Sequence, residues 1–131
     1  MNVGEVAVIR GNDKVEAIKE SHVVVKGGIQ GIELTFTFTV PKADQAISQL
    51  VSAFRNDSEI VVGAGTVVDA GTAHFAIMAG AEYIVSPNFD KETAELCNLY
   101  QNLENPAKFY NYVYFDMEED TRVFHMMGKP D

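Results

Sequence analysis

The sequence has a single cysteine, Cys97, so an internal disulfide is excluded and a hydrophobic core must hold the fold. A lone cysteine fits a reducing compartment. No uninterrupted apolar run approaches the length that crosses a membrane. Residues 1–10 also lack the basic start and apolar run of a signal peptide. We therefore expect a cytoplasmic protein without membrane contact.

Basic residues are scarce as well. Ten Lys and Arg stand against 19 Asp and Glu, which gives a net charge of −9 at pH 7. Proteins that bind the phosphate backbone of nucleic acids need the opposite balance, so we expect no nucleic-acid partner. One small anionic ligand remains compatible with this charge because it needs only a local site. The sequence has no metal-ligand spacing, and we expect neither a metal nor a cofactor.

Predicted strands and helices alternate along the chain of 131 residues, a length that suits one compact domain. Short apolar runs at Val6–Ile9, 60–62 and 84–85 predict strands covered on both faces, and residues 29–40 predict another strand. Each strand is followed by apolar residues at helical spacing, at Lys14–Lys26, 43–54, 69–79 and 90–100. This alternation predicts an α/β fold built from βα units around a parallel sheet.

The stretch 61–67 organises the predicted site. It predicts a short buried strand that runs into a Gly63-Ala64-Gly65-Thr66 turn. Glu33 lies among apolar residues of another strand, where an unpaired charge is costly, so it must find a partner or face a cavity. Ligands of parallel βα units bind at the carboxyl ends of the strands. If the two strands are neighbours, Glu33 and Thr66 face one pocket.

Each of these residues also has an ordinary structural explanation. Glu33 could pair with Arg10 at the end of a neighbouring strand. Gly63 and Gly65 could let a ligand carboxylate approach backbone N–H groups, or could form a tight turn without any ligand, because an isolated Gly-x-Gly is a weak signal. Thr66 could bind a carboxylate or cap the following helix.

The composition changes after residue 101, which predicts a boundary between 1–101 and 102–131. Aromatic residues concentrate at 109–124, with tyrosines alternating along 110–114 and an acidic group at 118–120. This pattern predicts an antiparallel hairpin-like tail with an acidic turn rather than a fifth βα unit. A shifted reading frame or an artificial junction would produce a similar change.

Four motifs, in order, resemble the first half of the 2-keto-3-deoxy-6-phosphogluconate (KDPG) and 4-hydroxy-2-oxoglutarate aldolases. They lie at 6–10, 27–35, 63–67 and 79–87, and the resemblance covers about residues 5–101. It implies a (β/α)8 TIM barrel, here present in part, that usually forms a trimer. It also implies a class I lyase that cleaves 2-keto-3-deoxy sugar acid phosphates to pyruvate and glyceraldehyde 3-phosphate through a lysine Schiff base.

The resemblance assigns roles to individual residues. Glu33 matches the general acid/base glutamate, Thr66 the threonine near the pyruvyl carboxylate, and Pro87 the proline that shapes the pocket. Thr37 stands where many members have arginine. The candidate site therefore combines catalytic Glu33 with a set of substrate-binding residues: Arg10, Thr37, Gly63, Gly65, Thr66 and Pro87.

The Schiff-base lysine of the family lies on the sixth strand, beyond the matched residues. Neither Lys108 nor Lys129 stands in a matching motif. We therefore expect an aldolase-like protein that keeps the acid/base half of the site, takes a pyruvate-like 2-keto acid, and is inactive as this chain alone. The alternative is a non-catalytic module that binds a small carboxylate or assembles with a partner. Because four βα units cannot close a barrel, we expect the tail or a second copy of the chain to cover the open sheet.

Overall fold

The computed structural model describes residues 5–11, 13–35, 42–102, 111–116 and 123–128. In these residues one sheet contains six strands, in the order β1-β2-β3-β4-β5-β6. The strands and helices follow the chain as β1 (Val6–Ile9), α1 (Lys14–Lys26), β2 (Gly31–Thr35), α2 (Ala43–Ala53), β3 (Val61–Gly65), α3 (Ala70–Met78), β4 (Tyr83–Ser86), α4 (Lys91–Asn102), β5 (Asn111–Asp116) and β6 (Val123–Gly128).

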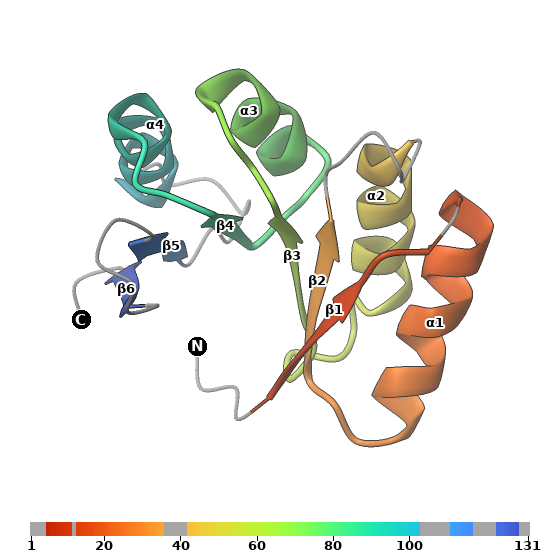
Figure 1. Cartoon of the computed structure of the whole chain (residues 1–131). Helices are drawn as coiled ribbons and strands as arrows, with labels where there is room; N and C mark the ends of the chain where they lie inside the picture. Colours follow the sequence, from red (N-terminus) through yellow and green to blue (C-terminus); the bar gives the residue numbers. More distant parts are fainter. Residues whose placement is uncertain (1–4, 12, 36–41, 103–110, 117–122, 129–131) are drawn as a thin grey trace.

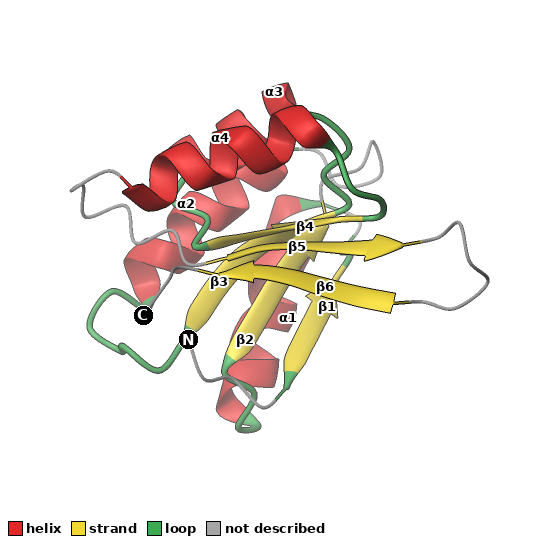
Figure 2. Ribbon diagram, turned by 90° about the vertical axis from the view of Figure 1, so that its left-hand side faces the viewer, coloured by secondary structure: helices red, strands yellow, loops and turns green. Residues whose placement is uncertain are grey.

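Strands β1 to β5 pair in parallel, each with its neighbour, and only β5 and β6 pair antiparallel. The four helices lie on one side of the curved sheet and form its outer layer (Figure 1). Seen from the side, the β5–β6 hairpin continues the sheet beyond β4 (Figure 2). The predicted βα units and the antiparallel pairing of the two tail strands are confirmed, although β5 also pairs in parallel with β4. The predicted acidic turn at 118–120 lies outside the described residues, and the proposed division near residue 102 remains a prediction.

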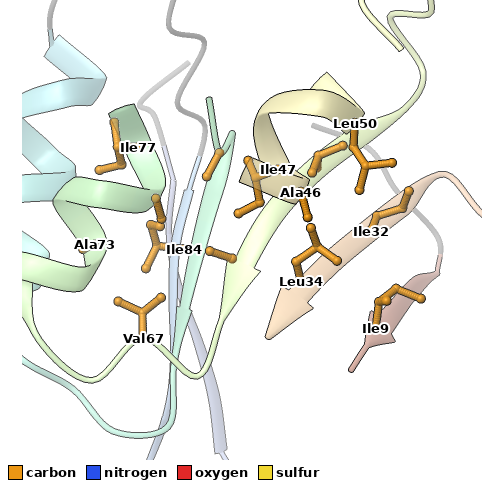
Figure 3. Packing of buried hydrophobic residues seen from close by; sticks show 14 of the residues in the cluster. Ile9, Ile32, Leu34, Ala46, Ile47, Leu50, Val67, Ala73, Ile77 and Ile84 are labelled. Carbon is orange, nitrogen blue, oxygen red and sulfur yellow. The ribbon is translucent and has the colours of Figure 1, made fainter. Parts of the chain in front are cut away.

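The main core fills the space between the sheet and the helices. Alternate strand residues point into it, including Ile32, Leu34 and Ile84, which are fully buried (Figure 3). Helix α2 contributes Ile47 and Leu50 to the same cluster. The single cysteine, Cys97, is buried there too, as its place on a predicted helix suggested.

Aspartates start three of the helices. Asp13 accepts a hydrogen bond from the Glu16 backbone N–H at 2.8 Å, and Asp69 does the same for Thr72 at 2.7 Å. Asp90 accepts from the Thr93 N–H at 3.0 Å. Side chains of this kind satisfy N–H groups that lack a partner inside the helix, so short sequence signals fixed these three starts.

Three boundaries or environments predicted from the sequence were wrong. β1 is not covered on both faces: Val6 is 45% and Val8 52% exposed, because β1 is an edge of the open sheet. β2 begins at Gly31 rather than at residue 29, and residues 36–41 lie outside the described part. β3 continues through Gly63 and Gly65, which the sequence placed in a turn.

No helix in the described part of the chain is both long enough and apolar enough to cross a membrane.

Candidate active site

Glu33 and the glycines of β3 form the centre of the candidate site. In the register of β2 and β3, Glu33 lies beside Gly63, and Thr35 lies beside Gly65. The side chain of Glu33 nevertheless reaches forward over Gly65. A Cβ at Gly65 would lie 2.6 Å from Cδ of Glu33 and still closer to its carboxylate oxygen Oε2. Glu33 therefore points toward the carboxyl ends of the strands.

This contact explains why glycine occupies position 65. Real Cβ atoms do not approach other atoms this closely, so any larger residue would displace the Glu33 carboxylate. The sequence assigned Gly65 to a turn that leaves room for a ligand. In the structure it lies in a strand, and the group that uses the room is the protein's own carboxylate.

Burial raises the pKa of Glu33 above its ordinary value, and the positive charge of Arg10 partly opposes that increase. Glu33 and Arg10 form no direct ion pair in the described part of the chain, where Lys91 and Glu95 form one on the surface of α4. Arg10 is therefore an electrostatic neighbour of Glu33 rather than its salt-bridge partner.

Thr35 adds a second polar group near Glu33. It is 2% exposed and follows Glu33 by two residues, so both side chains project from the same face of β2. Its hydroxyl finds no hydrogen-bond partner among the described residues. The sequence placed Thr35 inside a predicted strand, residues 29–40, and gave no reason to single it out.

Thr66 follows β3 and has a φ of 56°, in the left-handed region. This conformation is strained for a β-branched residue, and such strain gathers at functional sites. Its neighbour Val67 donates a backbone hydrogen bond to the carbonyl of Val85 at 3.1 Å, which ties the turn to β4. Pro87 follows the end of β4. Thr37 lies outside the described residues.

Tyr83 was missed by sequence reasoning, which recognised it only as part of a strand. It projects from the face of the sheet opposite the helices, where it clusters with Val61 and Val85. Its hydroxyl donates a hydrogen bond to the carbonyl of Ile32 at 2.6 Å, across β3. The ring lies on Gly63, since a Cβ there would be 2.5 Å from three ring atoms. The contact between Tyr83 and Gly63 depends on how β3 and β4 align in the sheet, so the sequence alone could not have revealed it.

The described residues contain no cluster of three or more His, Cys, Asp or Glu side chains able to hold a metal ion. An open groove of about 450 Å³ lies between α2 and α3 on the outer layer, lined by residues such as Ser48 and Phe75. It is separate from Glu33, which lies on β2.

The model of the KDPG and KHG aldolase family matches residues 2–106. The chain belongs to this family. That assignment agrees with the parallel βα architecture and confirms the resemblance seen in the four motifs. The family match also covers every candidate site residue.

Individual aldolases are similar to this chain in sequence or in structure, as the family assignment predicts. The chain is 30% identical to 2-dehydro-3-deoxy-phosphogluconate aldolase of Treponema pallidum over 83 residues, 63% of this chain and 37% of the relative. A solved structure described as native KDPGal has 25% identity and a TM-score of 0.66, over 76% of this chain and 47% of the other. KDPG aldolase from Legionella pneumophila, solved with pyruvate captured as a covalent carbinolamine, has 28% identity and a TM-score of 0.55, over 85% and 46%. The chain thus spans less than half the length of these relatives.

A short match of a different kind also exists. Twenty residues, 15% of this chain, are 95% identical to 4-deoxy-L-threo-5-hexosulose-uronate ketol-isomerase 1 of Enterococcus faecalis, of which they cover 7%. This identity is far higher than that to the aldolases, but over a much shorter stretch.

Proposed function

We propose that this chain supplies the proton-transfer half of an aldolase site for 2-keto-3-deoxy sugar acid phosphates, which are cleaved to release pyruvate. The observation that carries the proposal is the partly buried carboxylate of Glu33, held over Gly65 and directed to the carboxyl ends of β2 and β3. Ligands of parallel βα units bind at that edge. A carboxylate kept partly out of water there suits general acid/base chemistry.

In this proposal Glu33 moves the protons of the reaction. Its ionised form takes the proton of the C4 hydroxyl as the C3–C4 bond breaks. The raised pKa then lets Glu33 hold that proton and deliver it to C3 of the pyruvyl fragment. Thr66 and the end of β3 receive the carboxylate of the 2-keto acid, with Pro87 beside it. Arg10 adds positive charge near an anionic substrate, and Thr37 belongs to the same proposed set.

Carbon–carbon cleavage of this class also needs an electron sink, which a lysine amine provides by forming an iminium with the keto group. No lysine of the described residues takes that position in our proposal, and Lys108 and Lys129 lie outside them. We therefore infer that full activity requires a lysine-bearing second half, from a partner chain or from a longer protein.

Borohydride reduction in the presence of pyruvate, followed by intact-mass analysis, tests the proposal. We expect no added mass for this chain alone, because no lysine is placed to form the imine. A gain of one reduced pyruvyl group would mean that a lysine of this chain works, and peptide mapping would identify it. Pyruvate-dependent changes in the NMR signal of the Glu33 side chain test binding separately, with Glu33→Gln as the control.

A second candidate is a non-catalytic assembly or carboxylate-binding module. The observation that favours it is the open sheet, whose β1 edge carries the exposed residues Val6 and Val8. Such an edge invites pairing with another chain. Native mass spectrometry tests it: a dimer or trimer that forms without pyruvate supports assembly, and a strict monomer contradicts it.

We infer that the isomerase-like match lies in residues 107–131. The family match ends at residue 106, the remaining stretch is long enough for 20 residues, and β6 pairs antiparallel with β5, unlike the parallel strands before it. On this inference the chain joins an aldolase half to a segment of a second enzyme. Alignment of residues 107–131 with the isomerase tests the location. A match confined to residues before 107 would contradict it.

A further inference from the structure

The direction of the Glu33 side chain needs an explanation. Its register partner on β3 is Gly63, a residue without a side chain, so the space directly beside Glu33 would otherwise be open. The carboxylate instead lies over Gly65, two residues further along β3. Two residues of a strand correspond to about 6–7 Å, so Glu33 leans strongly along the strand instead of projecting straight out of the sheet.

Tyr83 occupies the space that Glu33 leaves unused. Its ring atoms Cε1, Cε2 and Cζ would each be 2.5 Å from a Cβ at Gly63, so the outer end of the ring rests on that glycine. Two strands away from Tyr83, the carbonyl of Ile32 accepts the tyrosine hydroxyl at 2.6 Å. Ile32 is the residue immediately before Glu33. The ring is therefore fixed at both ends, by β4 and by the backbone of β2.

The space above each glycine is thus filled by a side chain from a neighbouring strand. The Tyr83 ring lies over Gly63, and the Glu33 carboxylate lies over Gly65. Tyr83 is 3% exposed, and its ring covers Gly63, the register partner of Glu33. A Glu33 side chain placed over Gly63 would meet this ring, whereas the space over Gly65 holds its carboxylate.

We propose that Tyr83 is a positioning residue for Glu33: its ring, anchored on the Ile32 carbonyl, directs the Glu33 carboxylate over Gly65 and toward the substrate edge of the sheet. Only the suggestion that this orientation serves catalysis rests on the proposed function. The contacts of Tyr83 with Gly63 and Ile32 require no substrate. Tyr83 does not transfer protons in this proposal. It acts through the orientation and hydration of Glu33.

A titration of the Glu33 carboxyl carbon by ¹³C NMR tests this in the whole chain. We expect Tyr83→Phe, which keeps the ring on Gly63, to retain a raised Glu33 pKa. Tyr83→Ala opens the space over Gly63 to water and should lower the Glu33 pKa toward that of an exposed glutamate. Val61→Ala is the matched control, because it removes a buried side chain of the same cluster without uncovering Gly63.

Three outcomes would overturn the proposal. They are a Glu33 pKa unchanged in folded Tyr83→Ala, an equal decrease in Val61→Ala, or a decrease in Tyr83→Phe as large as that in Tyr83→Ala. If Tyr83→Ala does not fold, Tyr83→Leu replaces it, since leucine keeps apolar volume but lacks the ring that rests on Gly63. The titration needs neither pyruvate nor a lysine, so failure of the proposed aldolase chemistry in the borohydride experiment would leave its result unaffected.

Discussion

The carboxylate of Glu33 occupies the space that a side chain at Gly65 would need. The two residues lie on neighbouring parallel strands, yet they are not register partners, because Glu33 pairs with Gly63 and Gly65 pairs with Thr35. A charged group is thereby held partly out of water at the end of the sheet where this fold class binds its ligands.

Replacement of Gly65 should displace the Glu33 carboxylate. In Gly65→Ala the new methyl group meets only the flexible end of the Glu33 side chain, which can move aside, so we expect the free energy of unfolding to fall by about 1 kcal/mol, the low end for overpacked interiors. Gly71→Ala is the matched control. It lies in α3, where the nearest atom to a new Cβ is 3.5 Å away, and alanine favours helix by about 1 kcal/mol over glycine. Urea unfolding of both variants measures the difference, and a loss of similar size in both would contradict the Glu33 contact.

The stability of the protein should depend on pH through Glu33. Because its pKa is raised in the folded state, the folded chain keeps a proton that the unfolded chain has already released. This stabilisation is complete below the ordinary glutamate pKa and is lost as the pH rises through the folded-state pKa. Between the two values the free energy of unfolding falls by at most about 1.4 kcal/mol per pH unit.

Glu33→Gln should remove this pH dependence, because glutamine does not titrate. Urea unfolding from about pH 4 to about pH 8 measures it, since that range spans the ordinary glutamate pKa and the values above it. Glu92→Gln, the same change at an exposed position of α4, should leave the dependence in place. An identical slope in wild type and Glu33→Gln would show that Glu33 does not titrate differently in the folded state.

The strained turn at Thr66 predicts that glycine is the more stable residue there. Thr66→Gly relieves a left-handed conformation that is unfavourable for a β-branched side chain, and we expect the free energy of unfolding to rise by up to about 1 kcal/mol. The same variant should lose affinity for pyruvate if the threonine hydroxyl binds the carboxylate. Thr72→Gly, within α3, is the control and should lower stability by about 1 kcal/mol or less. Equal losses in both variants would contradict strain at Thr66.

Cys97 should be unreactive while the chain is folded. It is fully buried, and burial raises the pKa of its thiol to about 12, so almost no thiolate is present near neutral pH. An aromatic disulfide reagent reacts with thiols and releases a product that absorbs light, so the reaction can be followed by absorbance. It should modify Cys97 slowly in the native protein and rapidly in denaturant. Rapid reaction without denaturant would mean that α4 does not stay packed on the sheet.

The local pattern of the sequence determined the order and type of the elements. Apolar periodicity distinguished strand from helix, and aspartates at the helix starts set three boundaries, because a cap needs only residues that are close in the chain. The same pattern singled out Glu33 as a charge inside a strand. Four motifs then identified the aldolase family, which the family match over residues 2–106 confirms.

Tertiary structure alone decided what surrounds Glu33. The glycines at 63 and 65 looked like a turn because glycine favours turns locally, but they lie in β3, where side chains from β2 and β4 need their space. Strand neighbours also decided that β1 stays open on one face and that β5 pairs with β4. Register between segments far apart in the chain has no local signature, because it arises only when packing brings them together. The sequence thus determined which residue carries the charge, and the assembled sheet decided where that charge points.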